Sequence, residues 1–265
     1  MGLLANEWAG AGASSKRYRN PNVKPAWYKS RQRSITPAQK RIERTLWPIF
    51  GLTFAYNQRI QLDQAFGRQA PTVLEIGCGA GEAIVELAEA QPEANFVGCD
   101  WFRSGLATCL KSIEERNLTN VRLVRADAAT LLDRGLPAEP LFDEVKIFFP
   151  DPWYGSPERR VVRSEVVRQI SARMRPSGFV HVATDVADYP AHVREVFASP
   201  LASGGVWRAD TARRVFRPST RYAREGVAEG RSIEDLHFAF EGLHGHDDDE
   251  DEPRSAVTTR QSEDV

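Results

Sequence analysis

The hydrophobic pattern of this chain changes its period near Thr72. From there, short β-rich apolar runs alternate with segments whose apolar positions recur every three or four residues. The apolar runs predict strands over 72–76, 95–100, 121–126, 142–149 and 178–184. The amphipathic segments predict helices over 82–90, 103–116, 161–174 and 190–198. Such alternation is typical of an α/β fold, here a doubly wound, mostly parallel sheet with helices on both faces.

Two later apolar runs, near 206–210 and 236–240, extend this pattern as candidate edge or antiparallel strands. Sheets of this kind bind ligands beyond the carboxyl ends of their strands. The residues that directly follow each predicted strand are therefore the first place to look for chemistry.

The segment that precedes the sheet is predicted to be helical. Thr36 and Pro37 form a good helix start, with a threonine at the N-cap and a proline in the first turn. We expect this helix to continue to about Trp47 and to be broken by Pro48, because proline has no backbone N–H. A second helical stretch is expected over 55–66.

The formal net charge of −1 conceals a strong asymmetry along the 265 residues. Residues 16–44 hold ten Lys or Arg and one acid, with Trp27 and Tyr28 among them. Cations interleaved with aromatic rings suit the phosphates and exposed bases of RNA, and they are also compatible with a plain disordered arm. Residues 247–252 are six consecutive acids. The expected organisation is a basic, disordered arm over 1–34, a main domain with an N-terminal helical extension over 35–241, and an acidic, disordered tail over 242–265.

The three cysteines, Cys78, Cys99 and Cys109, do not have the spacing of metal ligands, and no metal site is predicted. An odd number of cysteines in or near apolar segments favours reduced, buried thiols and a cytoplasmic protein. The N-terminus lacks the long apolar stretch of a signal peptide. No apolar run approaches the roughly 20 residues that span a bilayer, so no membrane association is expected. Monomer and homodimer are both compatible with the sequence.

The first predicted strand ends in a glycine-rich turn. Glu75 is followed by Gly77, Gly79 and Gly81, and glycines let a turn adopt positive φ and let a ligand approach the backbone closely. The fingerprint of a nicotinamide dinucleotide requires a further glycine at the position of Glu82. A carboxylate there would repel a pyrophosphate at the helix N-terminus, which argues against a dinucleotide.

Each of the next three strands also ends in an acid. Asp100 follows the second strand, where it could accept hydrogen bonds from both ribose hydroxyls of an adenosine. Asp127 follows the third, where an acid can contact an adenine edge, and Asp151 follows the fourth. Each acid alone is typical of a helix N-cap or a turn, but with Glu75 they form a ring of carboxylates. The sulfonium and ammonium groups of S-adenosylmethionine suit such a ring electrostatically.

The most specific sequence signal is a set of short motifs. They are Leu-Glu-Ile-Gly-Cys-Gly over 74–79, Phe-Phe-Pro-Asp-Pro-Trp over 148–153, Ala-Thr-Asp over 183–185, Arg-Pro-Ser-Thr-Arg-Tyr over 217–222 and Glu-Asp-Leu-His-Phe over 234–238. With these motifs, residues 36–241 resemble the bacterial tRNA (guanine-N7)-methyltransferases, class I enzymes with a Rossmann-like fold that use S-adenosylmethionine. The motif over 148–153 is highly specific, whereas the glycine turn alone is not.

The resemblance implies roles for the acids at the strand ends. Glu75, Gly77, Gly79 and Asp100 would bind S-adenosylmethionine, with Asp127 near its adenine. Asp151 would lie beside the methionine part of the cofactor and the incoming base, as the catalytic residue. The implied partner is tRNA, methylated at guanine 46 of the variable loop.

The resemblance also implies substrate-binding residues. Asp185 and Thr220 would belong to the guanine pocket, and Arg160 and Arg217 are candidates for holding phosphates. The sequence leaves simpler roles open for each of them. Asp185 could cap the helix predicted over 190–198, Thr220 could form a local turn bond, and the arginines could be solvated.

The sequence departs from the family pattern in two places. After Trp153 the family usually continues with a basic stretch, but here residues 154–158 are Tyr-Gly-Ser-Pro-Glu, and the segment is slightly shorter. The acid that follows Thr-Lys-Phe in the family is replaced by Ala223. Both changes fall on predicted substrate residues, so the prediction of the cofactor is stronger than that of tRNA.

Three alternatives therefore stay open. A diverged methyltransferase could act on another RNA or a small acceptor, which the changed residues after Trp153 and at Ala223 favour. A non-catalytic RNA-binding module could keep the fold, although retention of all four carboxylates argues against it. A nicotinamide dehydrogenase is disfavoured by Glu82 and by the lack of Tyr/Lys or His machinery.

Overall fold

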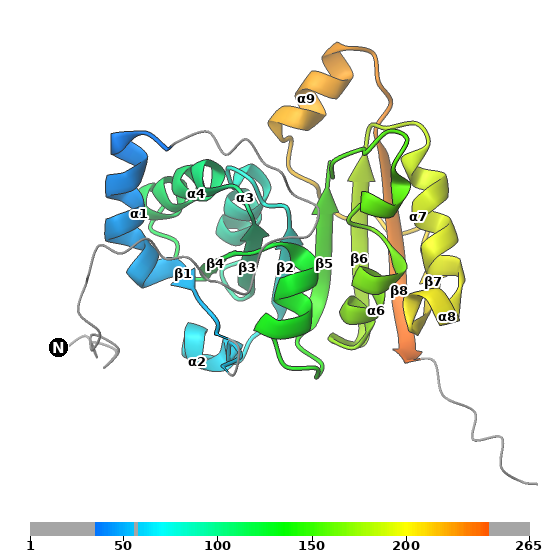
Figure 1. Cartoon of the computed structure of the whole chain (residues 1–265), viewed down its shortest axis with the longest axis horizontal. Helices are drawn as coiled ribbons and strands as arrows, with labels where there is room; N and C mark the ends of the chain where they lie inside the picture. Colours follow the sequence, from blue (N-terminus) through cyan, green and yellow to red (C-terminus); the bar gives the residue numbers. More distant parts are fainter. Residues whose placement is uncertain (1–34, 56–57, 244–265) are drawn as a thin grey trace, which may run out of the picture.

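The described residues form one eight-stranded sheet flanked by helices (Figure 1). The computed structural model describes residues 35–55 and 58–243, so the expected basic arm and nearly all of the expected acidic tail lie outside the described residues. The strands are β1 (Gly51–Leu52), β2 (Thr72–Ile76), β3 (Asn95–Asp100), β4 (Val121–Arg125), β5 (Phe142–Phe148), β6 (Met174–Thr184), β7 (Gly205–Ala209) and β8 (Glu234–Leu243).

The strand order is β1-β4-β3-β2-β5-β6-β8-β7. All pairs from β1 to β6 are parallel, whereas β8 lies antiparallel to both β6 and β7. The predictions of a mostly parallel α/β sheet and of antiparallel strands at one edge are therefore confirmed. The strand β1 was not predicted, because two residues are too short to show a period. The strand β6 begins four residues before the predicted start at 178, and β8 runs past residue 241.

The helices connect the strands in the expected alternation. They are α1 (Pro37–Phe50), α2 (Leu62–Phe66), α3 (Glu82–Ala90), α4 (Arg103–Glu115), α5 (Ala128–Thr130), a π-helical turn η1 (Leu131–Gly135), a 3-10 turn η2 (Pro157–Arg159), α6 (Ser164–Ser171), α7 (Tyr189–Ala198), α8 (Pro200–Ser203) and α9 (Arg221–Ala228). Thr36 caps α1 as predicted: its side chain accepts from the backbone N–H of Gln39, whose own side chain accepts from the N–H of Thr36.

Three helix predictions were wrong at their boundaries. The helix α1 continues through Pro48 to Phe50, because the missing N–H of that proline removes one bond only in the last turn. The helical stretch expected over 55–66 shrinks to α2, since Ile60 donates to the carbonyl of Gly135 rather than to a helical partner. The helix expected over 161–174 shrinks to α6, because Val162 is a core residue that lies before the helix.

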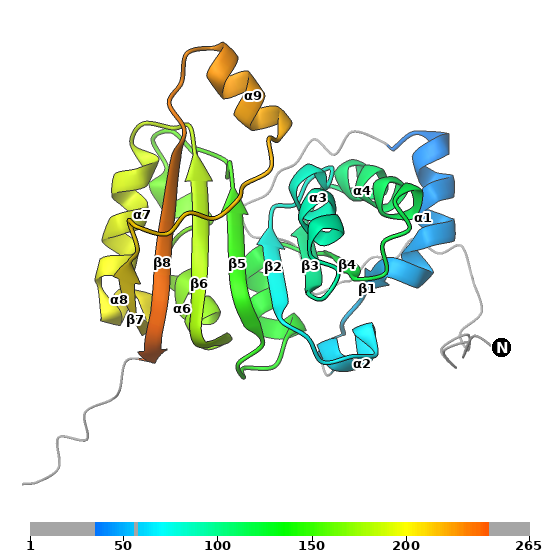
Figure 2. The same ribbon diagram turned by 180° about the vertical axis from the view of Figure 1, so that it is seen from behind.

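The two faces of the sheet are covered differently. On one face α1, α3 and α4 pack over β2, β3 and β4. On the same face, residues 210–220, here called the crossing segment, run across β8 and β6 in Figure 2 before they enter α9. On the opposite face, α6 and α7 pack against β5, β6 and β8. The crossing segment, which is irregular, thus crosses the part of the first face that α3 and α4 leave uncovered.

The three cysteines lie in the core as free thiols, which confirms the prediction of buried, reduced cysteines. Burial raises the pKa of each thiol, so all three stay protonated and unreactive near neutral pH. Within residues 35–55 and 58–243, no helix combines the length and the apolar character needed to cross a membrane.

Candidate active site

The glycine turn and the Asp151 motif lie at neighbouring strand ends. The strand β2 pairs in parallel with β5, while β3 and β4 extend the sheet in one direction and β6 extends it in the other. The chain therefore reverses its winding between β2 and β5, which is where α/β sheets open a crevice for ligands. Segments that are distant in the sequence meet at this point.

The glycine turn is shaped for close approach by a ligand. Gly77 and Gly81 have φ of 83° and 84°. A Cβ added at Gly77 would meet nothing within 4 Å, so the turn faces open space there. A Cβ at Gly81 would lie 2.3 Å from the Sγ of Cys109, so this glycine lets α3 pack on α4. Gly77 therefore faces open space, whereas Gly81 faces the core.

Asp100 braces the glycine turn from the end of β3. Its Oδ2 accepts from the backbone N–H of Gly79 at 2.8 Å, and its Oδ1 accepts from that of Phe102 at 2.6 Å. Burial raises the pKa of Asp100, while these backbone hydrogen bonds oppose the rise. A carboxylate has about four acceptor positions, so Asp100 keeps capacity for a ribose. Asp127 caps α5 one strand further away, accepting from the N–H of Thr130 at 3.0 Å.

Glu75 is the most perturbed acid of the site. It is only 4% exposed, and among the described residues its Oε2 has no hydrogen-bond partner. Burial raises the pKa of Glu75 to about 7, although the nearby Lys146 opposes the rise. A buried carboxylate oxygen without a partner is costly, and a cationic ligand would relieve that cost. The acids and the open glycine turn therefore fit a cationic adenosine cofactor.

The loop that carries Asp151 is held in an unusual backbone conformation. Phe149 and Trp153 have φ of 50° and 43°, which is rare for aromatic residues. Such backbone strain persists only where the surroundings enforce it, and it is common at functional sites. The guanidinium of Arg217 lies 5.3 Å from the Phe149 ring, and that of Arg159 lies 3.7 Å from the Trp153 ring. Two arginines thus flank the loop, one at each strained residue.

Asp151 lies at the exposed rim of the loop, near Asp100. Partial burial of its carboxylate raises the pKa of Asp151, and the charge of Asp151 in turn raises the pKa of Asp100. Asp100 likewise raises the pKa of Glu75. The structure therefore links Glu75 and Asp151 electrostatically through Asp100, while Asp127 lies one strand further away.

The predicted substrate residues are already engaged within the chain. The Nε of Arg231 donates to Oδ2 of Asp185 at 2.8 Å. Thr220 is the N-cap of α9 and accepts from the N–H of Ala223 at 3.3 Å, so the simpler local role is observed. Asp185 is not the cap of α7, which begins after Asp188.

Arg160 is turned into the protein rather than toward solvent. Its side chain is 3% exposed, donates to the carbonyl of Pro152 at 2.9 Å and pairs with Asp188 at 2.6 Å. It lies between η2 and α6. A phosphate contact by Arg160 stays a prediction that would require this pair to open.

A row of four polar residues crosses the sheet from β2 to β8, and its members other than Glu75 were not predicted as site residues. Glu75, Lys146, His181 and His237 lie in register on β2, β5, β6 and β8. Lys146 is 1% exposed and His181 is not exposed at all. A sequence signal was available, because Lys146 and His181 each lie between two apolar neighbours within a predicted strand.

Asp235 ties this row to the Asp151 loop. It accepts from the Nε2 of His181 and from the Nε of Arg217, each at 2.7 Å. Burial alone would raise the pKa of Asp235, but these two hydrogen bonds hold it well below its usual range. Arg217, a predicted phosphate ligand, therefore links Asp235 to the ring of Phe149.

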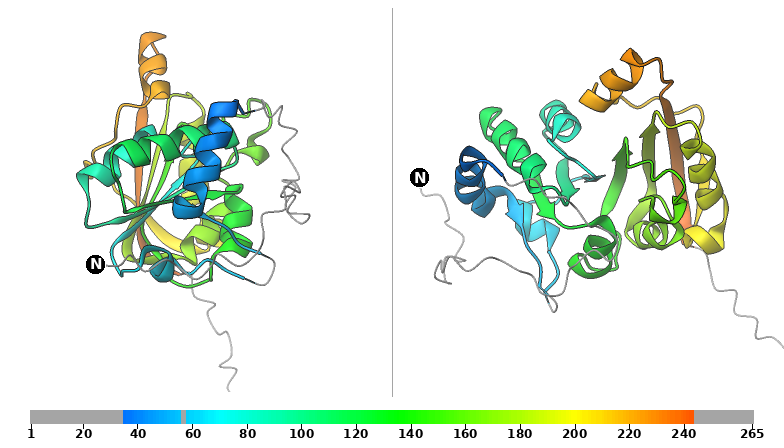
Figure 3. Two further views of the ribbon diagram at one scale, coloured as in Figure 1. Left: turned by 90° about the vertical axis from the view of Figure 1, so that its left-hand side faces the viewer. Right: turned by 45° about the horizontal axis from the view of Figure 1, so that its top comes forward.

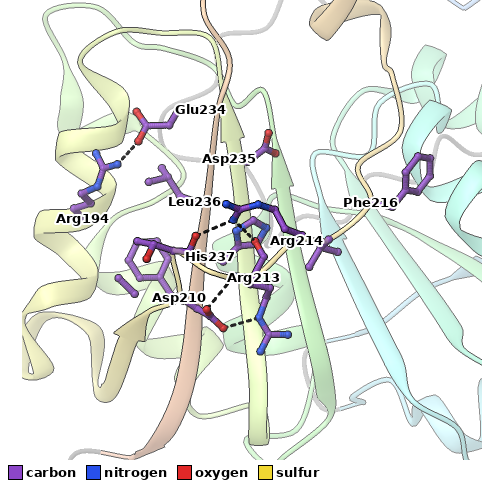
Figure 4. A pocket seen from close by; sticks show the side chains of 13 residues that line it. Arg194, Asp210, Arg213, Arg214, Phe216, Glu234, Asp235, Leu236 and His237 are labelled. Atoms are coloured by element: carbon purple, nitrogen blue, oxygen red, sulfur yellow. Dashed lines mark hydrogen bonds and ion pairs between the residues drawn. The ribbon is translucent and has the colours of Figure 1, made fainter.

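A cavity of about 600 Å³ opens between the start of the crossing segment and β8. Figure 4 shows Arg194 paired with Glu234 and Arg213 paired with Asp210 among the side chains that line the cavity, and Asp235 also lines it. The cavity thus adjoins the Asp235 network, and neither Glu75 nor Asp151 lines it.

Comparison with known proteins gives consistent matches. A family model described as "Putative methyltransferase" matches residues 69–236. A protein named tRNA (guanine-N(7)-)-methyltransferase from Alkalilimnicola ehrlichii is 39% identical over 212 residues, which cover 78% of this chain and 89% of the relative. One of the same name from Nitrosomonas eutropha is 38% identical over 213 residues, covering 80% and 94%.

Solved structures share the fold at lower identity. The 16S rRNA methyltransferase KamB aligns with a TM-score of 0.51 and 17% identity, over 72% of this chain and 95% of that one. The aminoglycoside resistance methyltransferase NpmB1 aligns with a TM-score of 0.50 and 21% identity, over 71% and 95%. At this level of identity the likeness concerns the fold alone.

Proposed function

Because the chain belongs to the tRNA (guanine-N(7)-)-methyltransferase family, we propose that it transfers a methyl group from S-adenosylmethionine to N7 of guanine 46 in the variable loop of tRNA. The observation that carries the proposal is the meeting of the Glu75 turn and the Asp151 loop at the ends of the adjacent strands β2 and β5. One strand end suits the cofactor, and its neighbour suits the acceptor. A tRNA substrate would also account for a cytoplasmic location.

The residues that would hold the cofactor are Glu75, Gly77, Gly79, Asp100 and Asp127. When bound, S-adenosylmethionine supplies an electrophilic methyl group on a sulfonium centre. The chain meets this cation with carboxylates and with an open turn, and it offers Glu82 where a pyrophosphate would need a neutral residue. The unpartnered Oε2 of Glu75 supports a cationic ligand most directly.

Asp151 would act on the acceptor by electrostatics. The N7 atom of guanine carries a free lone pair and no proton near neutral pH, so its attack requires no general base. Positive charge then builds on the purine, and the Asp151 carboxylate would stabilise it from a partly desolvated position. The strained backbone at Phe149 and Trp153 fixes that carboxylate before the substrate arrives.

Asp185 would select guanine over adenine. Its carboxylate can accept hydrogen bonds from N1–H and the 2-amino group, which adenine cannot offer in that arrangement. In the structure Arg231 occupies Oδ2 of Asp185, so a guanine would have to share or displace this partner. Adenine would leave the carboxylate without compensation for the loss of Arg231.

One observation favours a second candidate, a methyltransferase of another RNA or of a small acceptor. The segment after Trp153 folds into η2 and directs Arg160 inward, so the expected basic stretch presents fewer cations. The experiment that decides incubates unmodified tRNA with the protein and labelled S-adenosylmethionine and maps N7-methylguanine. Label at guanine 46 supports the proposal. Cofactor binding without label in tRNA favours the second candidate, and no cofactor binding favours a non-catalytic RNA-binding module.

A further inference from the structure

Glu82 makes contacts that neither the glycine turn nor the cofactor explains. It is the first residue of α3, directly after Gly81. Its Oε2 accepts a short hydrogen bond from the backbone N–H of Arg221, and its Oε1 lies 3.5 Å from Nη2 of Arg224. Both partners belong to α9, far away in the sequence. The carboxylate that argues against a pyrophosphate thus binds a helix from the other end of the domain.

The contact completes the N-terminus of α9. The first four N–H groups of a helix have no partner within it. Thr220 accepts from the N–H of Ala223, and Glu82 accepts from that of Arg221. A negative charge at this end is also favoured by the helix dipole. Glu82 therefore serves α9 as a second cap that is supplied from α3.

The far end of α9 is held by Asp185. A Cβ added at Gly226 would lie 2.8 Å from Oδ2 of Asp185, so the helix backbone touches the carboxylate directly. Arg231, just after the helix, donates to the same oxygen at 2.8 Å. Within the helix only Ala223 and Gly226 are buried, so few apolar contacts hold α9 in place. Its position depends on the polar contacts at its two ends.

These two ends lie on opposite sides of Asp151. Glu82 follows β2, Asp185 follows β6, and β5 lies between those strands. The helix α9 accordingly stands beyond the carboxyl ends of the strands in Figures 1 and 2, and the left view of Figure 3 shows it above the end of the sheet. It bridges Glu82, at the end of the glycine turn, and Asp185, in the predicted guanine pocket.

We infer that Glu82 is a positioning residue, which holds α9 and its cap Thr220 across the end of β5 in the arrangement that receives the acceptor. The expected change in KM rests on the proposed function, whereas the expected change in the docking of α9 does not. Without Glu82, α9 would populate its docked position for a smaller fraction of the time. Binding of tRNA would then supply the docking energy, which raises KM and leaves kcat unchanged.

The test compares Glu82→Ala, Glu82→Gln and the matched control Glu86→Ala, which removes an exposed acid from the same helix. Loss of a charged hydrogen-bond acceptor should raise KM for tRNA by about fivefold to tenfold in Glu82→Ala, with kcat within about twofold. Glutamine keeps an acceptor for the N–H of Arg221, so Glu82→Gln should recover most of the loss. Glu86→Ala should behave as the wild type.

Hydrogen exchange of the full chain gives a readout that does not depend on activity. Residues 221–228 should exchange faster in Glu82→Ala than in the wild type and the control, with the sheet unchanged. An unchanged KM together with unchanged exchange would overturn the inference. A weaker affinity for S-adenosylmethionine, with tRNA affinity intact, would also overturn it by assigning Glu82 to the cofactor. If the wild type does not methylate tRNA, the proposed function fails, and the exchange data alone decide the role of Glu82.

Discussion

Replacing Glu75 with glutamine should make the free protein more stable above neutral pH and weaken its binding of the cofactor. The carboxyl is 4% exposed, and burial raises its pKa from 4.5 to about 7. Glutamine has nearly the same shape but cannot ionise. The substitution therefore isolates the cost of a negative charge at this position.

The sign follows from linkage between protonation and folding. The unfolded chain loses its Glu75 proton near pH 4.5, and the folded protein loses it only near pH 7. The stability contributed by the protonated carboxyl is thus fully present below about pH 4.5 and is lost as pH rises through 7. One pKa unit is worth about 1.4 kcal/mol, so the loss between pH 5 and pH 8 is roughly 2.5 kcal/mol.

The assay is urea unfolding of both proteins at pH 5 and pH 8, without cofactor. The wild type should lose about 2.5 kcal/mol more unfolding free energy across this interval than Glu75→Gln does. The control Glu86→Gln removes an exposed acid from α3 and should follow the wild type. Parallel pH profiles for wild type and Glu75→Gln would refute the reasoning, because they would show that Glu75 does not titrate in this range.

Ionisation of Glu75 should also make cofactor affinity depend on pH. Affinity should rise with pH, whereas the stability of the free protein falls. A cationic cofactor stabilises the ionised carboxylate, so the affinity of the wild type should rise about tenfold from pH 6 to pH 8, with release of a proton. Calorimetry in buffers of different ionisation enthalpy measures that proton directly. Glu75→Gln should bind more weakly at pH 8 and show a flat profile. A proton released equally by both proteins would assign the linkage to another acid.

Other consequences follow from the same site. Asp151→Asn should lower kcat by about 10²- to 10³-fold while cofactor affinity changes far less, as measured in single-turnover methylation, because the acid acts on charge that develops during transfer. Gly81→Ala should lower the unfolding free energy measured in urea by more than about 2 kcal/mol, since the added Cβ would meet Cys109. Gly77 also has a positive φ, but an added Cβ there would meet open space, so Gly77→Ala should lower stability less and cofactor affinity more. Affinity for tRNA should fall at least about tenfold between 50 and 200 mM salt, and an affinity that ignores salt would contradict phosphate contacts by the arginines.

The strands were predictable from the sequence because their local signals and the tertiary fold agree. Runs such as 72–76 and 95–100 are mostly apolar on both faces, and the structure buries every one of their residues. The acids that follow them were found because a parallel sheet gathers its strand ends at one edge. Where local pattern and packing diverge, the prediction was wrong: Val162 has helical spacing with α6 but packs into the core from the turn before it.

The contacts that organise the site could not be predicted, since they join residues without a local relation. Nothing near Glu82 indicates a partner in α9, and nothing near Asp185 indicates Arg231. These pairs depend on where the chain returns after β7, and no periodicity encodes that return. The row that contains Lys146 and His181 was different, because a buried polar residue between two apolar neighbours of a strand usually has a polar partner.

Two of the arginines that were predicted to hold phosphates contact the Asp151 loop in the structure. Arg160 donates a hydrogen bond to the carbonyl of Pro152, and Arg217 pairs with Asp235 while lying against the ring of Phe149. Strained residues persist only where neighbours enforce their conformation, and these two side chains contact the loop at Pro152 and Phe149, on either side of Asp151. Both arginines therefore already have partners within the chain, next to Asp151 in the sequence or in the loop that carries it. A loss of methylation in an Arg160 or Arg217 variant would report on the loop first, and only a matched measurement of tRNA affinity would separate that effect from RNA binding.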